Sequence, residues 1–342
     1  MEAITREEKI MSGENLTPIT RKEMFLAKAA GQNIETPEPI TREEMFLSKI
    51  SGGAGGGGGD DWIKSFTEGS AVQLQREDIT SVADYKFRKD TSITDVDLPN
   101  VSTIGQYAFS EATALESLNL SNTVTLNAYA FKACTALKTA IIPNASSNGE
   151  VFYGCTALEH VDISNSSWGA GDGIYGSVFY NCSNLSTVKA DKCRIIGKSS
   201  FWGCKSLTKV RFPCVYRIGS NAFRFCSALS QIDFGENAIT VPSIDSYAFA
   251  DAYSLKAIIM RYQTMYKISN QNAFDSCHHF HGTVNETYNP NGLKDGYIYV
   301  PSALVEKYKS ETNWSTFADQ FRALEDYTVD GTITGELDES KI

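Results

Sequence analysis

The sequence has few of the signatures that mark catalytic, metal-binding or membrane proteins. Its glycine-rich run at 51–61 is not followed by the Gly-Lys-Ser/Thr that a phosphate loop requires, and no Gly-x-Ser-x-Gly, His-Glu-x-x-His or EF-hand motif occurs. The eight cysteines include no Cys-x-x-Cys pair, so a structural zinc site has no support. No apolar run approaches the roughly 18 residues of a membrane span. We therefore expect no cofactor, no metal and no membrane-spanning segment.

Positive charge is also scarce. The chain has 31 Lys and Arg against 41 Asp and Glu, a net charge of −10. Residues 325–342 hold six of the acidic side chains against the single Lys341, so half of the net charge lies at this end. The rest of the chain is only mildly acidic, and we do not expect a groove that binds nucleic acid.

A phenylalanine recurs nine times along the chain, at intervals of 21 to 27 residues. In most units a Cys or Ala follows it after three residues, and in seven units a Leu follows after six. The nine positions are Phe87, Phe109, Phe131, Phe152, Phe179, Phe201, Phe223, Phe249 and Phe274. A repeat of this length indicates a solenoid, in which units stack because none can bury its apolar face alone.

The segment 218–234 illustrates the expected structure of one unit. Residues from Ala222 to Cys226 suggest a single helical turn, too short to be stable alone. Ile232 and Phe234 alternate with polar residues, which predicts a strand with one buried face. Each unit would therefore add one strand to a long sheet and one turn to the opposite edge. The predicted fold class is an α/β repeat solenoid of about nine units.

Six of the cysteines occupy one position of the repeat, at which other units have alanine. Such a position behaves as a small buried hydrophobe. Although stacked units would bring neighbouring thiols close together, we expect free, buried cysteines rather than disulfides.

The units at 82–99, 104–120 and 218–234 resemble those of the BspA-like leucine-rich-repeat family, over residues of about 79–326. Residues 297–325 are similar to the C-terminal cap of such arrays. The resemblance implies a leucine-rich-repeat solenoid that serves adhesion or recognition. We therefore expect the capped solenoid to occupy 62–326 and an acidic tail to occupy 327–342.

Residues 1–50 follow a different pattern. Three copies of Ile-Thr-Arg begin at Ile4, Ile19 and Ile40, and each has a Glu three residues after its Thr, as is typical of a capping box at the start of a helix. We expect short helical repeats that dock onto a larger particle or onto copies of themselves. The segments 19–31 and 40–52 resemble N-terminal stretches of phage and prophage structural proteins. The glycine-rich run at 51–61 predicts a flexible linker.

Two clusters could suggest chemistry. His278, His279 and His281 follow one another closely, but they adjoin Cys277 and Phe280, two inward-facing positions of the repeat, and this favours a surface turn over a metal site. The Gly-x-Gly-x-x-Gly at 171–176 lies in the inserted loop of the longest unit, without the strand and helix that a dinucleotide site needs.

A binding surface is easier to specify. Positions eight and ten residues after each ladder Phe should point outward from the strands, and seven successive strands would present two columns of differing side chains. The residues we single out on this face are His160, Asp162, Lys189, Lys209, Arg211, Gln231 and Asp233. Ile141 and Ile259 occupy the same columns and are apolar where water is expected.

The inserted loop adds aromatic side chains as a second candidate surface. Trp168 and Tyr175 are its predicted contact residues, while Tyr180 could equally belong to the core.

The function that these features favour is recognition without catalysis. We expect a protein or glycan receptor as the partner and a phage or prophage tail as the larger particle. The alternatives are a bacterial surface or host-interaction adhesin and, in another class, a glycan-active enzyme with an unrecognised site. No signal peptide is evident, because the first apolar run comes only after Arg6, Glu7 and Glu8 and is interrupted by charge. This favours a virion-associated protein, or one in the bacterial cytoplasm before assembly, over a cell-surface protein.

Overall fold

The computed structural model describes residues 65–66, 72–75, 77–120, 122, 124–147, 149–166, 173–174, 176–235, 242–281 and 294–327. All of them belong to the unit of the chain that begins at Lys64. The predicted N-terminal helices, the linker at 51–61 and the acidic tail beyond residue 327 lie outside the described residues.

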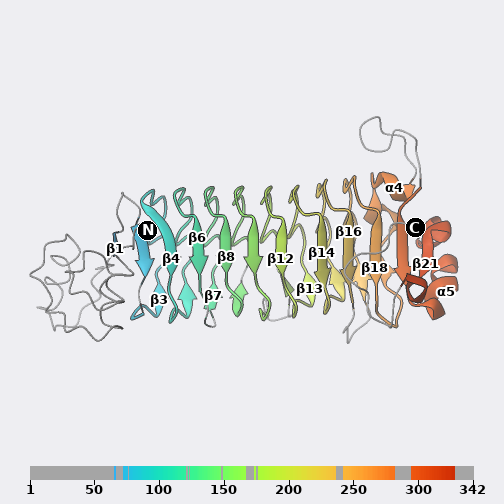
Figure 1. Cartoon of the computed structure of the whole chain (residues 1–342), viewed down its shortest axis with the longest axis horizontal. Coiled ribbons are helices and arrows are strands. Elements are labelled where there is room, and N and C mark those ends of the chain that lie inside the picture. The colour runs from blue at the N-terminus through green and yellow to red at the C-terminus, as the bar shows by residue number, and fades with distance from the viewer. Residues whose placement is uncertain are drawn as a thin grey trace, which may run out of the picture. The chain divides into compact units, whose positions relative to one another are not determined.

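The described unit is a parallel β-solenoid (Figure 1). Its longer strands form two successive sheets, and all their pairs are parallel except β1 with β2. The first sheet contains β1 (Ser65–Phe66), β2 (Val72–Gln75), β4 (Ile93–Asp97), β6 (Ser117–Asn119), β8 (Thr139–Ile141), β10 (His160–Asp162) and β12 (Thr187–Lys189). The second contains β14 (Lys209–Phe212), β16 (Gln231–Phe234), β18 (Ala257–Met260), β20 (Tyr297–Val300) and β21 (Phe321–Ala323). The predicted leucine-rich-repeat solenoid is confirmed.

Shorter strands form a second side of the solenoid. One sheet comprises β3 (Ser81–Val82), β5 (Thr103–Ile104), β7 (Val124–Leu126) and β9 (Ala145–Ser147). The other comprises β11 (Gly173–Ile174), β13 (Ile195–Ile196), β15 (Arg217–Ile218), β17 (Ser243–Ile244) and β19 (Lys267–Ile268). The break between β9 and β11 falls in the 27-residue unit, where the sequence inserts a loop.

In the rungs of Phe87 to Phe249 the remaining edge is built from consecutive β-turns, so the helical turn predicted for the segment 222–226 is wrong; only in the rung of Phe274, among the described residues, does a 3-10 helix, η1 (Gln271–Phe274), lie there. In the rung of Phe223, the Arg224 N–H donates to the Asn221 carbonyl at 3.2 Å, whereas the Phe223 N–H donates to Ala248 of the next rung at 2.7 Å. Asn221 and Phe225, on either side, have φ of 58° and 60°. These left-handed residues reverse the chain twice and turn alternate N–H groups towards the neighbouring rung. In a helical turn the same N–H groups would donate to carbonyls of their own rung. We call this hydrogen-bonded border the turn edge.

The core is the phenylalanine ladder predicted from the repeat. All nine rings are buried, and successive rings stack with centroids 5.0 to 5.6 Å apart. Stacking at about the spacing of parallel strands lets each rung cover the ring of the one before it.

The cysteine prediction is confirmed and has a further reason. All eight cysteines are free, and all but the half-buried Cys214 are buried. The six ladder thiols donate to the carbonyl of a ladder Phe one rung earlier, as Cys226 Sγ does to Phe201 at 3.0 Å. A cysteine therefore supplies a small apolar group and a weak donor at once.

Short helices close the C-terminal end. They are η1 (Gln271–Phe274), α4 (His278–His281), η2 (Ser302–Leu304), α5 (Val305–Ser310), η3 (Ser315–Gln320) and η4 (Leu324–Tyr327). Trp314 is fully buried, 6.0 Å from the ring of Phe274, and its Nε1 donates to the Tyr266 carbonyl at 2.6 Å. The last rung therefore packs on aromatic side chains of the cap instead of another repeat.

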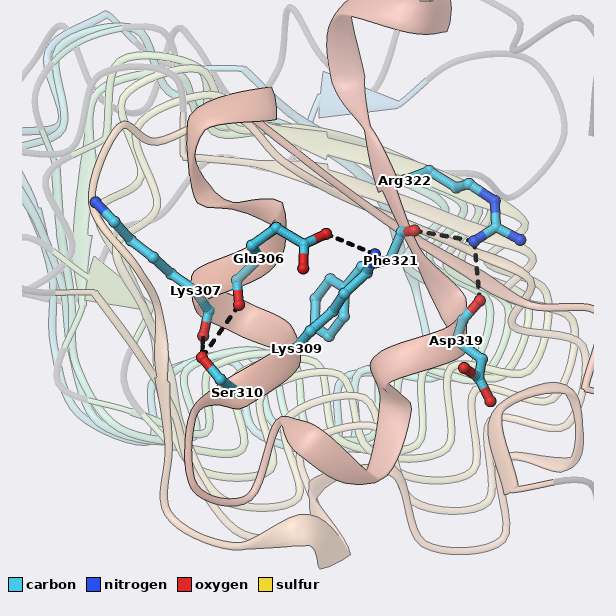
Figure 2. Close-up of polar contacts among 7 residues, drawn as sticks. All are labelled: Glu306, Lys307, Lys309, Ser310, Asp319, Phe321 and Arg322. Atoms are coloured by element: carbon cyan, nitrogen blue, oxygen red, sulfur yellow. Dashed lines mark hydrogen bonds and ion pairs between the residues drawn. The ribbon is translucent and has the colours of Figure 1, made fainter.

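Polar contacts finish the cap (Figure 2). Within α5, Lys309 pairs with Glu306 at 2.8 Å, and Ser310 Oγ donates to the carbonyls of Glu306 and Lys307. Arg322, on the last strand β21, donates to the carbonyls of Asp319 and Phe321, at 2.9 Å each. Because a last strand can pair with another chain, using these acceptors internally helps to end the array.

Candidate recognition surface

The outward surface of the longer strands, which we call the strand face, carries two columns of side chains in register. In the first column Ser117 lies opposite Thr139, which lies opposite His160 on the next strand. In the second column Asn119 lies opposite Ile141, which lies opposite Asp162. The same columns continue as Thr187 and Lys189 on β12, Lys209 and Arg211 on β14, and Gln231 and Asp233 on β16. The predicted outward spacing of eight and ten residues after the ladder Phe is therefore correct in register.

From β6 to β14 this face is open, and we call this part the open region. Its exposed residues are Ile141, His160, Thr187, Lys189, Lys209 and Arg211, whereas Ser117, Asn119, Thr139 and Asp162 are half-buried. Alternating strand residues such as Leu118, Ala140 and Val161 are buried beneath it. The polar side chains thus face water because the pleat sends their apolar neighbours into the core.

From β16 to β20 the face is covered, and we call this part the closed region. Asp233, Ala257 and Ile259 are 6%, 7% and 0% exposed, so the expectation that they face water is wrong. Ala257 and Ile259 pack with Tyr299 and Leu324 of the cap. The repeat pattern could not show this, because Leu324 comes from outside the repeats.

A salt bridge covers Asp233. Arg261 follows β18 and donates to both carboxylate oxygens of Asp233 at 2.7 Å. Arg211 lies 3.6 Å away on the other side and is much more exposed. Gln231 remains half-buried. Among the predicted contact residues on β16, Asp233 therefore has a structural partner and little surface to offer.

Charge changes sign along the strand face. Asp95 and Asp97 on β4 accept hydrogen bonds from Ser117 and Asn119, so the N-terminal end is acidic. Lys189, Lys209 and Arg211, which we call the cationic patch, lie at the other end of the open region. Lys189 pairs with Asp162 at 3.5 Å. Burial alone would raise the pKa of Asp162, but hydrogen bonds from Ser164 and the Lys189 charge lower it below its usual range.

The cationic patch spans a boundary between sheets. β12 ends the first sheet and β14 begins the second, whereas the turn-edge bonds continue, as from Phe179 N–H to the Ser200 carbonyl at 2.8 Å. Lys189 therefore belongs to one sheet and Lys209 and Arg211 belong to the next. Like charges on adjacent strands repel, and an anionic partner bound across them would relieve that repulsion.

The other predicted residues of chemical interest do not form a site in the described part of the chain. Trp168 and Tyr175 lie outside the described residues. Gly173 and Ile174 of the glycine motif form β11, which pairs in parallel with β13. This places a strand where a phosphate loop would need a turn.

His278 and His279 of the histidine cluster are buried, so their assignment to a surface turn is wrong. His278 and His279 on α4 are 4% and 8% exposed, and the His278 ring stacks on Tyr253 at 5.1 Å. His279 contacts the Asp295 carboxylate, and Lys256 lies 3.2 Å from the same group. Partial burial raises the pKa of Asp295, but the hydrogen bonds and charges of His279 and Lys256 together lower it below its usual range. The described residues contain no group of three metal-ligating side chains suited to a metal ion.

The structure also shows a surface that the sequence does not predict. A stripe of aromatic rings runs along the turn edge and consists of Tyr85, Tyr107, Tyr129, Tyr153, Tyr180, Trp202, Phe225 and Tyr247. The ring of Tyr180 is half-buried and stacks between those of Tyr153 and Trp202, with centroids 4.7 and 4.3 Å away. Tyr180 is therefore part of this stripe and not of the phenylalanine core. Because the rings stack on each other, they present mainly their edges to solvent.

Two cations join the segments of this aromatic stripe. Lys132 Nζ lies 5.1 Å from the ring centroid of Tyr129 and 5.5 Å from that of Tyr153. Arg224 lies over Phe225 and Tyr247 at 4.9 and 5.7 Å. The rings occupy three different sequence positions relative to the ladder Phe of their unit. For this reason no single position of the repeat is aromatic throughout, and the sequence does not predict the stripe.

No helix among the described residues is long and apolar enough to cross a bilayer.

Comparison with known proteins identifies the repeat. A family model described as a BspA type leucine rich repeat region matches residues 65–169 and 150–281. Comparison with curated protein sequences gave no match.

Several solved structures resemble this chain. A leucine-rich repeat protein from Bacteroides ovatus is 25% identical, with a TM-score of 0.47 over 71% of this chain and 66% of that one. A leucine rich cell surface protein from Faecalibacterium prausnitzii is 19% identical, with a TM-score of 0.39 over 75% and 85%. A leucine-rich repeat protein from T. pallidum is 19% identical, with a TM-score of 0.34 over 60% and 83%.

Proposed function

The chain belongs to the BspA-type leucine-rich-repeat family, and from this premise we propose that it is a recognition protein without catalytic activity, whose binding site is the open region of the strand face. The family match is to a repeat region and indicates no catalytic family. The observation that carries the proposal is the open region itself, with two columns of changing side chains held in register by hydrogen-bonded strands from β6 to β12 and continued on β14 across the boundary between the sheets.

The geometry suits an extended partner. Neighbouring strands lie about 4.8 Å apart, so the open region from β6 to β14 is roughly 20 Å long. A peptide strand or a glycan chain lying across the strands would meet Ser117 and Asn119 first and Lys209 and Arg211 last. Because rigid strands hold these groups in place, little conformational freedom is lost on binding.

Charge would set the direction in which the partner lies. Asp95 and Asp97 are at one end of the face and the cationic patch is at the other. Complementary charge accelerates encounter and rejects wrong registers more than it adds affinity. Binding should therefore weaken with salt through a slower association rate.

Glycan and peptide arrays probed with the full chain would test this proposal. The variant K189S/K209S/R211S removes the cationic patch, and K192S/K198S/K205S removes the same charge from exposed residues of neighbouring rungs off the face. The first should lose about threefold or more in affinity for any ligand found, and the second should bind as the parent does. Both should remain within about 0.5 kcal/mol of the parent in stability.

Equal binding by parent and patch variant would overturn the proposed site. A loss confined to Y180A/W202A would instead assign recognition to the aromatic stripe.

For residues 1–50 we propose attachment to a larger particle, in the first instance a phage or prophage tail. The repeated Ile-Thr-Arg segments and the glycine-rich run at 51–61 support a docking segment joined to the solenoid by a linker. An antibody against the chain should then detect it in purified particles. Detection on intact bacteria but not in particles would favour the alternative, a cell-surface adhesin.

A glycan-active enzyme is the alternative of another class. Incubation of the chain with each glycan that it binds on the array, followed by chromatography of the products, distinguishes the two. Recognition without catalysis predicts unchanged glycans, and shortened chains would contradict it.

A further inference from the structure

The sequence continues after the cap with an acidic segment. Residues 328–342 contain Asp330, Glu336, Asp338 and Glu339 against one lysine. The cationic patch is the basic end of the open region. We propose that residues 328–342 bind across the cationic patch as its intramolecular ligand. The proposal deepens the proposed function, since it names an acidic, extended polypeptide as the kind of partner that this surface accepts.

The cap brings the chain to the correct face. Leu324 packs with Ala257, Ile259 and Tyr299, which belong to the outward columns on β18 and β20. The carboxylate of Glu325 accepts a hydrogen bond from the Ser302 N–H at 2.8 Å and holds η4 in place. η4 therefore lies beside the strand face at β18 and β20, a few strands from the cationic patch.

The distances are well within reach. β14 is two strands from β18 and β12 is three, which makes about 10 and 15 Å at the spacing of parallel strands. An extended chain covers about 3.3 Å per residue. Asp330, three residues after Tyr327, can therefore reach about 10 Å, and Glu336 can reach about 30 Å.

The surface between the two is compatible with an acidic chain. It is formed by β16, where Asp233 is the acidic residue nearest the patch. Both oxygens of Asp233 are held by Arg261, and Arg211 is adjacent, so its charge is already compensated. Gln231 beside it is neutral. An acidic segment crossing β16 meets little repulsion before it reaches Lys209 and Arg211, which are both exposed.

The contact would be weak enough to exchange. An exposed ion pair contributes little by itself, but a short tether keeps its ligand at an effective concentration in the millimolar range. Several such pairs would occupy the patch at low salt and leave it when a longer acidic partner competes. Acting in this way, the segment would raise the threshold for recognition and exclude weakly acidic partners.

Carbodiimide coupling of the isolated full chain tests the contact directly, because it forms an amide without a spacer and therefore favours amines and carboxylates that spend time in contact. In about 20 mM salt, where screening is weak, Lys189 and Lys209 should couple to residues 328–342 at several times the yield of the exposed Lys205 and Lys267. A mixture of ¹⁴N and ¹⁵N chains should give couplings within one isotope only. Equal yields at the control lysines, or couplings only in mixed-isotope pairs, would overturn the proposal.

Lysine acetylation gives a second readout. In D330N/E336Q/D338N/E339Q, acetylation of Lys189 and Lys209 should be about two- to threefold faster than in the parent, as it should be in the parent at about 0.5 M salt. The matched variant E77Q/D275N/E311Q/D319N changes the net charge equally at exposed residues off the patch, and it should leave these rates unchanged. An equal rise in both variants would reduce the effect to net charge and overturn the proposal.

Both tests use the protein without a partner. A failed coupling would leave recognition by the strand face standing, and a failed array experiment would leave the coupling result standing.

Discussion

Ile141 and Ile259 occupy the same column of the strand face, yet Ile141 is 43% exposed and Ile259 is fully buried. Ile141 lies in the open region and Ile259 lies in the closed region beneath Tyr299 and Leu324 of the cap. The repeat places both residues identically, and the difference comes from elements that follow the repeat. Position within a repeat therefore decides which face a side chain joins, while exposure depends on what packs onto that face.

The largest expected effect compares these two isoleucines. Ile259→Asp would bury a carboxylate among Ala257, Tyr299 and Leu324, at a cost of roughly 3–4 kcal/mol of unfolding free energy. Ile141→Asp, at an exposed position, should cost no more than about 0.5 kcal/mol. Urea denaturation of the two variants measures the difference. Similar costs for both would show that the cap does not seal the closed region.

A second comparison concerns the two arginines around Asp233. Arg261 is largely buried and bonds both carboxylate oxygens, whereas Arg211 is exposed and more distant. Arg261→Ala should cost roughly 2 kcal/mol because it leaves a buried carboxylate poorly compensated. Arg211→Ala should cost under about 0.5 kcal/mol, as exposed ion pairs do. A larger loss of stability in Arg211→Ala than in Arg261→Ala would contradict the view that Arg261, and not Arg211, is the structural partner of Asp233.

A third comparison uses pH. Burial lowers the pKa of His278, with His279 lowering it further and Asp251 opposing the shift. The unfolded chain therefore binds a proton near pH 6.5 that the folded chain resists, so this stabilisation is complete above about pH 6.5 and declines as the pH falls. Between pH 7 and 5, amide exchange, corrected for its intrinsic rate, should accelerate in α4 and β20 before it does in β6 to β10. His278→Phe should suppress the acceleration, and its persistence in that variant would exclude His278 as the cause.

The smallest expected effect concerns the thiols, which should not distinguish the two regions. Burial raises the pKa of five ladder thiols, and only the thiolate reacts; the five are Cys134, Cys182, Cys204, Cys226 and Cys277. Titration of the native protein should detect at most the half-buried Cys214, and titration after denaturation should detect all eight. Rapid native reaction of five or more thiols would contradict a continuous, tightly packed ladder.

The repeat predicts the parts of the molecule that each rung builds by itself. The phenylalanine ladder, the buried cysteines and the register of the two outward columns all follow from residues within one unit. The helical turn was wrong because left-handed residues such as Asn221 and Phe225 allow successive turns, and the inter-rung hydrogen bonds that reward this geometry are invisible in a single unit.

The parts that escaped prediction depend on contacts between distant segments. The burial of Asp233 needs Arg261, 28 residues later, and the burial of Ile259 needs Leu324 of the cap. His278 and His279 are buried because the chain continues as a cap instead of another rung. The aromatic stripe combines rings from three repeat positions, so it becomes visible only when the rungs are stacked.

The central claim is that the open region of the strand face carries recognition, and a lysine footprint tests it most directly. The full chain would be acetylated with and without a ligand found on the arrays, and the modification rate of each lysine would be compared. The account predicts protection of Lys189 and Lys209 by about threefold or more, with Lys192 and Lys205 on the neighbouring rungs unchanged. Protection of Lys132 within the aromatic stripe, with Lys189 and Lys209 reacting as freely as before, would contradict it.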